Sequence, residues 1–254
     1  MPAVKGFLEL LFPPRCPLCD RLLDISDIRE KRSIHTACLA RLYPVGQPSC
    51  FHCGKPLDNE AEEYCADCAA RISKRRNFLP GNMPFSYITQ GKALFVYQGD
   101  IRQTMYRFKY SNRREYARFF AEEACEKYGG WMLKNGIEAV VPVPMYKKKE
   151  KQRGYNQAKI FAKEVGKRMG FAFEPDAVRR LIETSPQKKL NAKERKNNIK
   201  NAFHAQDFVV KYSCILLVDD IYTTGATAEA VAGALCQAGI SRIYFLSVCT
   251  GRGV

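Results

Sequence analysis

Residues 215–227 read ILLVDDIYTTGAT, an apolar run that ends in two adjacent aspartates and continues into hydroxyl-bearing residues and a glycine. The apolar part is typical of a buried strand of a parallel sheet. In open α/β sheets, ligands bind outside the carboxyl ends of the strands, which is where Asp219 and Asp220 are expected to lie. This stretch therefore predicts both the fold class and the position of a binding site.

The residues after the aspartates predict a site for a phosphorylated sugar. A turn that leads into a helix presents backbone N–H groups without internal partners, from which an entering phosphate can accept hydrogen bonds. The two carboxylates can accept hydrogen bonds from the hydroxyls of a ribose. In the alternative interpretation, the aspartates only cap the helix and the threonines only form the turn. The residues expected to surround the phosphate are Thr223, Thr224, Gly225, Ala226 and Thr227.

The segments on either side alternate between strand and helix patterns. Such alternation predicts right-handed crossovers and a parallel sheet, so we expect an α/β protein. The sheet domain is expected to cover residues 93–254, after a linker at 76–92 that is rich in proline, glycine and positive charge. The periodicity predicts strands at 93–97, 139–144, 215–218 and 243–248, and helices at 114–128, before Gly170 and around 228–235.

Seven of the eleven cysteines lie before residue 70 and, with one histidine, form four pairs of candidate metal ligands. Two residues separate the members of each pair, the spacing at which a tight turn points two side chains at one tetrahedral metal. His52 is an alternative donor to His35. A disulfide framework is the competing interpretation, but the lack of a recognisable secretion signal favours a reducing cytoplasm. Residues 1–75 are therefore expected to form a domain with two structural zinc ions, held by Cys16, Cys19, His35 and Cys38 and by Cys50, Cys53, Cys65 and Cys68.

The charge balance predicts a polyanionic partner. Lysine and arginine outnumber the acids by 41 to 26, which gives a formal charge of +15. No run approaches the roughly 20 apolar residues of a membrane helix, so we expect no membrane insertion. The apolar residues of 1–16 are expected to dock on the body as an amphipathic helix.

Aromatic residues interleave with cations at 106–116, a pattern typical of single-strand binding, although Phe108 and Tyr116 are expected in the core. A run of lysines can also be only a solvated face. The residues expected to bind single-stranded DNA are Lys109, Arg113, Arg114, Lys148, Lys149, Lys151, Arg153, Lys188, Lys189, Lys193, Arg195 and Lys196.

The stretch ILLVDDIYTTGAT closely resembles the signature with which type I phosphoribosyltransferases bind phosphoribosyl pyrophosphate (PRPP). Three further motifs are KYSNRRE (109–115), VPVPMYKKKEKQRGYNQA (141–158) and SPQKKLNAKERKNNIKNAF (185–203). With the paired zinc ligands, they make the chain similar to the ComF family of competence-associated proteins over nearly its whole length. His35 departs from the family pattern, which has a cysteine there.

This resemblance implies a phosphoribosyltransferase-type parallel sheet behind a double zinc ribbon. It also implies that Asp219 and Asp220 hold the ribose and are the catalytic residues, that Mg²⁺ accompanies PRPP, and that the basic stretch QKKLNAKERKNNIK (187–200) forms a closing loop or a DNA contact. The family function is DNA uptake in natural transformation, with single-stranded DNA, PRPP and a helicase as partners. The alternative is an active enzyme that transfers ribose 5-phosphate to a nucleobase-like acceptor, which the sequence does not identify. By position, the pyrophosphate loop contains Pro144, Met145, Tyr146 and Lys147.

Overall fold

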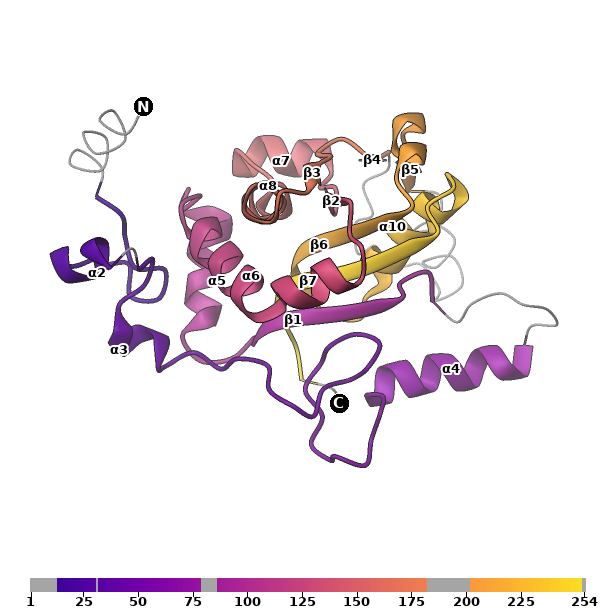
Figure 1. The fold of residues 1–254 in the computed structure, drawn as a ribbon, viewed down its shortest axis with the longest axis horizontal. Coiled ribbons are helices and arrows are strands. Elements are labelled where there is room, and N and C mark those ends of the chain that lie inside the picture. The colour runs from indigo at the N-terminus through magenta and orange to yellow at the C-terminus, as the bar shows by residue number, and fades with distance from the viewer. Residues whose placement is uncertain (1–12, 31, 79–85, 182–201, 253–254) are drawn as a thin grey trace.

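The computed structural model of the protein describes residues 13–30, 32–78, 86–181 and 202–252 (Figure 1). Its centre is a five-stranded sheet with the order β1-β7-β6-β2-β3, in which every neighbouring pair is parallel. A second, antiparallel pair joins β4 to β5. The strands are β1 (Gln90–Val96), β2 (Ala139–Pro142), β3 (Ala172–Phe173), β4 (Val178–Arg180), β5 (Phe203–Ala205), β6 (Cys214–Tyr222) and β7 (Arg242–Thr250).

Helices connect and cover these strands. The short helices α2 (Ile25–Arg29) and α3 (Thr36–Leu39) lie in the cysteine-rich region, which ends in α4 (Ala66–Phe78). The 3-10 helix η1 (Asp207–Lys211) leads into β6. The helices of the sheet region are α5 (Ile101–Tyr110), α6 (Tyr116–Lys134), α7 (Lys147–Arg153), α8 (Gln157–Met169) and α10 (Ala226–Gln237).

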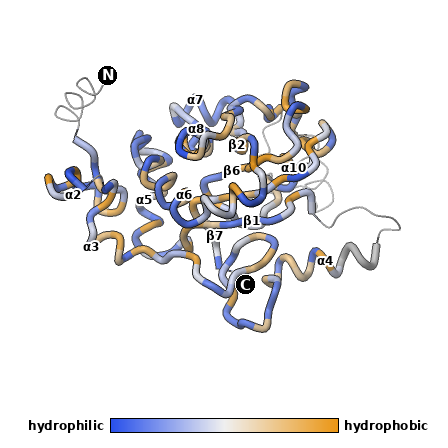
Figure 2. The backbone as a smooth tube through the Cα atoms, in the orientation of Figure 1, coloured by the Kyte–Doolittle hydropathy of each residue, from blue (hydrophilic) through white to orange (hydrophobic). Residues whose placement is uncertain are grey.

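The sheet separates two apolar cores because successive side chains of a strand point to opposite faces. On one face, Leu216 and Val218 pack with buried residues of α5, α6 and α8. On the other, Ile215 and Leu217 pack with α10 and with the β4–β5 pair. Figure 2 shows hydrophobic residues along β6 and α10, whereas α7 is hydrophilic. The fold is therefore a three-layer α/β arrangement, a class in which ligands bind outside the carboxyl ends of the strands.

The α/β class and the parallel sheet predicted from the sequence are confirmed. Gly170 ends α8 with a φ of +73°, as its position after the apolar repeat predicted. Strand β6 is longer than expected, because it continues through both aspartates to Tyr222. Strand β1 begins at Gln90, inside the stretch expected to be a linker, and the domain boundaries stay a prediction.

No helix within the described ranges has both the length and the apolar character needed to cross a bilayer. The amphipathic helix expected in the first sixteen residues lies mostly outside the described part of the chain. The motif at 185–203 lies almost entirely outside it, and so do the expected DNA-binding residues Lys188, Lys189, Lys193, Arg195 and Lys196.

Candidate functional site

The acidic pair lies near the carboxyl end of the central strand β6. Asp219 stands beside Ser247 of β7, and Val218 stands beside Pro142 of β2. The Val143 N–H donates to the Val218 carbonyl at 2.8 Å. The segment that follows β2, which contains the expected pyrophosphate loop at 144–147, therefore starts next to Asp219.

Local hydrogen bonds and one ion pair fix the two carboxylates. The Asp220 N–H donates to Asp219 Oδ1 at 2.8 Å, and the Ile221 N–H donates to Asp220 Oδ1 at 2.7 Å. Lys109 Nζ, from the last turn of α5, lies 2.8 Å from Asp220 Oδ2. Desolvation and the neighbouring Asp220 charge raise the pKa of Asp219 well above its ordinary value. The two neighbours therefore differ. Asp220 has a cation partner in Lys109, whereas the raised pKa of Asp219 favours its protonated form.

The turn after β6 is shaped around a tyrosine ring. Gly225 is buried and has a φ of +73°, and a Cβ atom at this position would fall on the ring and hydroxyl of Tyr222. The first hydrogen bond within α10 runs from the Glu229 N–H to the Gly225 carbonyl, so the N–H groups of Thr227 and Ala228 have no partner in the preceding turn. Thr224 Oγ1 accepts from the Ala226 N–H at 3.4 Å. The turn therefore presents backbone donors at the amino end of α10, where an anion is favoured.

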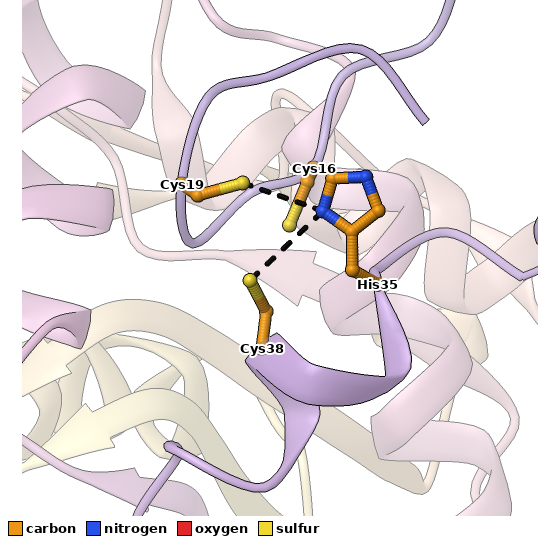
Figure 3. Close-up of side chains that lie close together, drawn as sticks. All are labelled: Cys16, Cys19, His35 and Cys38. Carbon is orange, nitrogen blue, oxygen red and sulfur yellow. Dashed lines mark hydrogen bonds between the residues drawn. The ribbon is translucent and has the colours of Figure 1, made fainter. Parts of the chain in front are cut away.

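The first group of metal ligands is Cys16, Cys19, His35 and Cys38, whose ligand atoms all lie within 4.8 Å of one another (Figure 3). His35 Nδ1 faces the sulfurs and lies 3.3 Å from Cys19 Sγ. His35 Nε2 lies 2.9 Å from the Leu22 carbonyl, an outer contact that fixes the ring orientation. The structure thus groups His35, rather than His52, with these three cysteines, and its role as a zinc ligand stays a prediction.

The second group is Cys50, Cys53, Cys65 and Cys68, again with all ligand atoms within 4.8 Å. All four residues are buried, and Cys53 Sγ lies 3.6 Å from Cys65 Sγ. Tetrahedral ligands with Zn–S distances of about 2.3 Å stand about 3.8 Å apart, so both groups fit a closed four-ligand zinc site. Two structural zinc sites are therefore supported by the donor atoms that the chain supplies.

His52 has another position, between the second metal group and α10. Its side chain is buried, and Nε2 lies 3.4 Å from Glu229 Oε1 in the first turn of α10. The same carboxylate accepts from the Ser86 hydroxyl at 2.5 Å and from the Tyr87 N–H at 3.1 Å. Burial alone would raise the pKa of Glu229, but these hydrogen bonds lower it. The cysteine-rich region is thus in contact with α10, a contact between distant parts of the chain that no sequence motif predicts.

The structure divides the cations expected to bind DNA into three groups. Lys109 lies in the acidic site, and Arg113 donates to Asp20 Oδ2 at 2.9 Å. Arg114 is exposed, and so are Lys148, Lys149 and Lys151 of α7, whereas Arg153 at the end of the same helix is partly buried. The third group lies outside the described residues, as stated above. Lys109 is the residue whose role sequence reasoning missed, because only the tertiary fold brings α5 to the end of β6.

Comparisons with known proteins agree with this arrangement. Residues 7–69 match the family model of the double zinc ribbon domain. Competence protein F of Haemophilus influenzae is 29% identical over 234 residues, which cover 90% of this chain and 93% of that protein. Competence protein ComFC of Bacillus subtilis is 24% identical over 213 residues, 84% of this chain and 81% of that protein. The DNA utilization protein YhgH of Escherichia coli K12 is 30% identical over 112 residues, 44% of this chain and 49% of that protein.

Proposed function

Because the chain is similar to ComF-type competence proteins along most of its length, as its motifs predicted, we propose that it assists DNA uptake in natural transformation. The relatives are named for competence and for DNA utilization, and two of them align with more than four fifths of this chain. The double zinc ribbon, which lies before the sheet, is the proposed contact for a helicase partner.

The proposed small-molecule ligand is PRPP, bound at the end of β6. The observation that supports it is that the acidic pair on β6 is followed directly by the glycine turn at the start of α10, where the first backbone N–H groups have no preceding helical turn to bond. In this proposal Asp219 and Asp220 accept from the ribose hydroxyls, and the turn at 223–227 holds the 5-phosphate. The segment that starts beside Asp219 after β2 would contact the pyrophosphate, where Mg²⁺ would supply charge neutralisation through phosphate and carboxylate oxygens.

The proposed macromolecular ligand is single-stranded DNA. Five of the seven residues of α7 are lysine or arginine, and the four lysines are exposed. This helix concentrates part of the net charge of +15 on one exposed surface, where it can contact a phosphate backbone. We expect log affinity to fall by about 0.7 for each phosphate contact per unit of log salt concentration. A flat salt response would remove DNA from the proposal.

Calorimetric titration with PRPP and Mg²⁺ tests the small-molecule site. The double variant Asp219→Ala, Asp220→Ala should show no heat of binding, while wild-type protein should show saturable heat. Zinc content measured on the same samples should be equal, because neither aspartate belongs to a group of candidate zinc ligands. Unaltered PRPP affinity in the double variant would refute the assignment of this site.

The contact of Lys109 with Asp220 favours a second candidate, transfer of ribose 5-phosphate to an acceptor. A lysine at the acidic pair could stabilise charge that develops as pyrophosphate departs. An assay of pyrophosphate release across nucleobases, with and without single-stranded DNA, tests this function. Turnover with a single base would identify the acceptor, and no release with any base would reject catalysis.

A further inference from the structure

Two tyrosines on α5 form an exposed pair. Tyr106 and Tyr110 are 56% and 58% exposed, whereas Phe108 and Tyr116, from the same aromatic series, are fully buried. Because residues four apart lie on one face of a helix, the two rings meet, with centroids 5.1 Å apart and planes inclined at 47°. The exposed half of the aromatic series is therefore a compact surface that the core does not use.

A basic segment is held against this pair. Arg153, at the end of α7, donates to the Tyr110 hydroxyl at 3.1 Å, and its guanidinium carbon lies 4.9 Å from the Tyr110 ring centroid. The residues that follow fix this contact, since the Tyr155 hydroxyl and the Gln157 amide both donate to the Phe108 carbonyl. The exposed lysines of α7 are thus attached to the tyrosine pair through Arg153, with Glu150 as the single acid in that helix.

The combination of exposed rings and clustered cations selects one class of partner. Aromatic faces alone would suit many proteins, but five cations in a seven-residue helix favour a polyanion. Ring faces can stack only on bases that are free of a duplex, so the partner must present unpaired bases together with phosphates. Charge and aromatic geometry therefore agree on a single-stranded nucleic acid.

We propose that Tyr106 and Tyr110 form a stacking platform for the bases of single-stranded DNA, with the α7 lysines on its phosphates. This inference rests on the proposed DNA binding, and it adds which residues contact the bases, namely these two tyrosines. It also removes Lys109 and Arg113 from the DNA surface, since both have carboxylate partners within the protein. Arg153 serves to hold the Tyr110 ring in position.

Fluorescence anisotropy with three probes tests the platform in the full-length protein. The probes are a labelled oligothymidylate of about 16 nucleotides, an abasic strand of the same length and a duplex. The double variant Tyr106→Ala, Tyr110→Ala should lose about 5- to 150-fold in affinity for oligothymidylate per stacked base. Its affinity for the abasic strand and the duplex, and its salt dependence, should be unchanged.

Two further variants separate stacking from folding. Tyr106→Phe with Tyr110→Phe keeps both rings and should bind oligothymidylate as the wild type does. Phe208→Ala removes an aromatic ring that is 46% exposed on η1, outside the proposed platform, and should also bind normally. Zinc content and the thermal midpoint of each variant report whether it is folded.

The possible failures are distinguishable. If wild-type protein binds oligothymidylate and the double alanine variant binds it equally well, the platform is wrong while DNA binding stands. An equal loss on the abasic strand would also overturn stacking, because that probe has no bases. If the wild type binds none of the probes, both the platform and the proposed DNA binding fall.

Discussion

At the scale of single residues, the acidic pair depends on a cation from a distant helix. Adjacent carboxylates repel each other, and desolvation adds to the cost of ionising both, as the raised pKa of Asp219 shows. Lys109 Nζ at 2.8 Å from Asp220 offsets part of this repulsion, and the two side chains are only 18% and 15% exposed. Because both partners are shielded from water, their interaction is stronger than that of an ordinary surface pair.

Lys109→Ala should therefore destabilise the protein and weaken PRPP binding. Removing the cation leaves the Asp220 carboxylate partly buried with one partner fewer, so we expect the free energy of unfolding to fall by about 1.5–3 kcal/mol. Urea denaturation measures this change. Lys159→Ala is the matched control, because its partner Asp176 is 68% exposed, and it should change stability by less than about 1 kcal/mol. Equal effects of the two variants would contradict the special position of Lys109.

Asp219→Asn should stabilise the protein at neutral pH while abolishing PRPP binding. The folded state raises the pKa of Asp219, so its ionisation lowers stability as pH rises above the ordinary aspartate value of about 4. Asparagine removes this penalty and still offers Oδ1 to the Asp220 N–H. The gain in unfolding free energy should be present at pH 7 and shrink as the pH approaches about 4. A loss of stability in Asp219→Asn at pH 7 would contradict the argument.

At the scale of elements, two glycines of equal φ have different roles. Gly225 and Gly170 both have a φ of +73°, but one begins α10 and the other ends α8. A Cβ at Gly225 would overlap Tyr222, whereas a Cβ at Gly170 would meet nothing within 4 Å. The comparison of the two positions therefore separates backbone strain from loss of packing space.

Gly170→Ala should lower the free energy of unfolding by about 1–2 kcal/mol, the strain of the left-handed conformation alone. Gly225→Ala should lower it by clearly more, because Tyr222 must move, and it should also weaken PRPP binding by displacing the turn. Chemical denaturation and calorimetry measure the two effects. Equal destabilisation, with PRPP affinity intact in both variants, would show that the Tyr222 contact does not shape the turn.

The sequence predicted four strands of the parallel sheet and the helices α6, α8 and α10, because each of these elements has its own apolar period. It did not predict where β1 begins or where β6 ends, since those limits depend on neighbouring segments. β1 starts early where the Gly91 N–H donates to the His52 carbonyl at 2.6 Å, and β6 runs on because β7 pairs with it up to Tyr222. The Lys109–Asp220 contact is likewise invisible in the sequence, because 110 positions separate the two residues along the chain. The motif was sufficient to locate the two aspartates, whereas the lysine that neutralises Asp220 is identified only by the packing of α5 against the end of β6.

At the scale of the whole molecule, both zinc groups are anchored to the sheet region. Beside the first group, the carbonyls of Pro17 and Leu18 accept from Thr104 and Arg107 of α5 at 2.9 and 2.6 Å. Beside the second, His52 contacts β1 and α10, as described above. The first zinc group is thus part of the support of α5, which carries both Lys109 and the tyrosine pair, and the second is part of the support of β1 and α10.

Withdrawal of zinc by a strong chelator should therefore loosen elements outside the cysteine-rich region. We expect amide hydrogen exchange in α5 and β1 to accelerate by at least about tenfold, the change produced by a loss of ~1.4 kcal/mol in local opening free energy. Helix α8, which packs on α6 and on β2 and β6, should keep its protection and serves as the internal control. Mass spectrometry of exchanged peptides measures all three elements in one sample. If only the cysteine-rich region exchanged faster, the zinc ribbons would be an independent unit, and the coupling of zinc to the DNA and PRPP surfaces through α5 would be wrong.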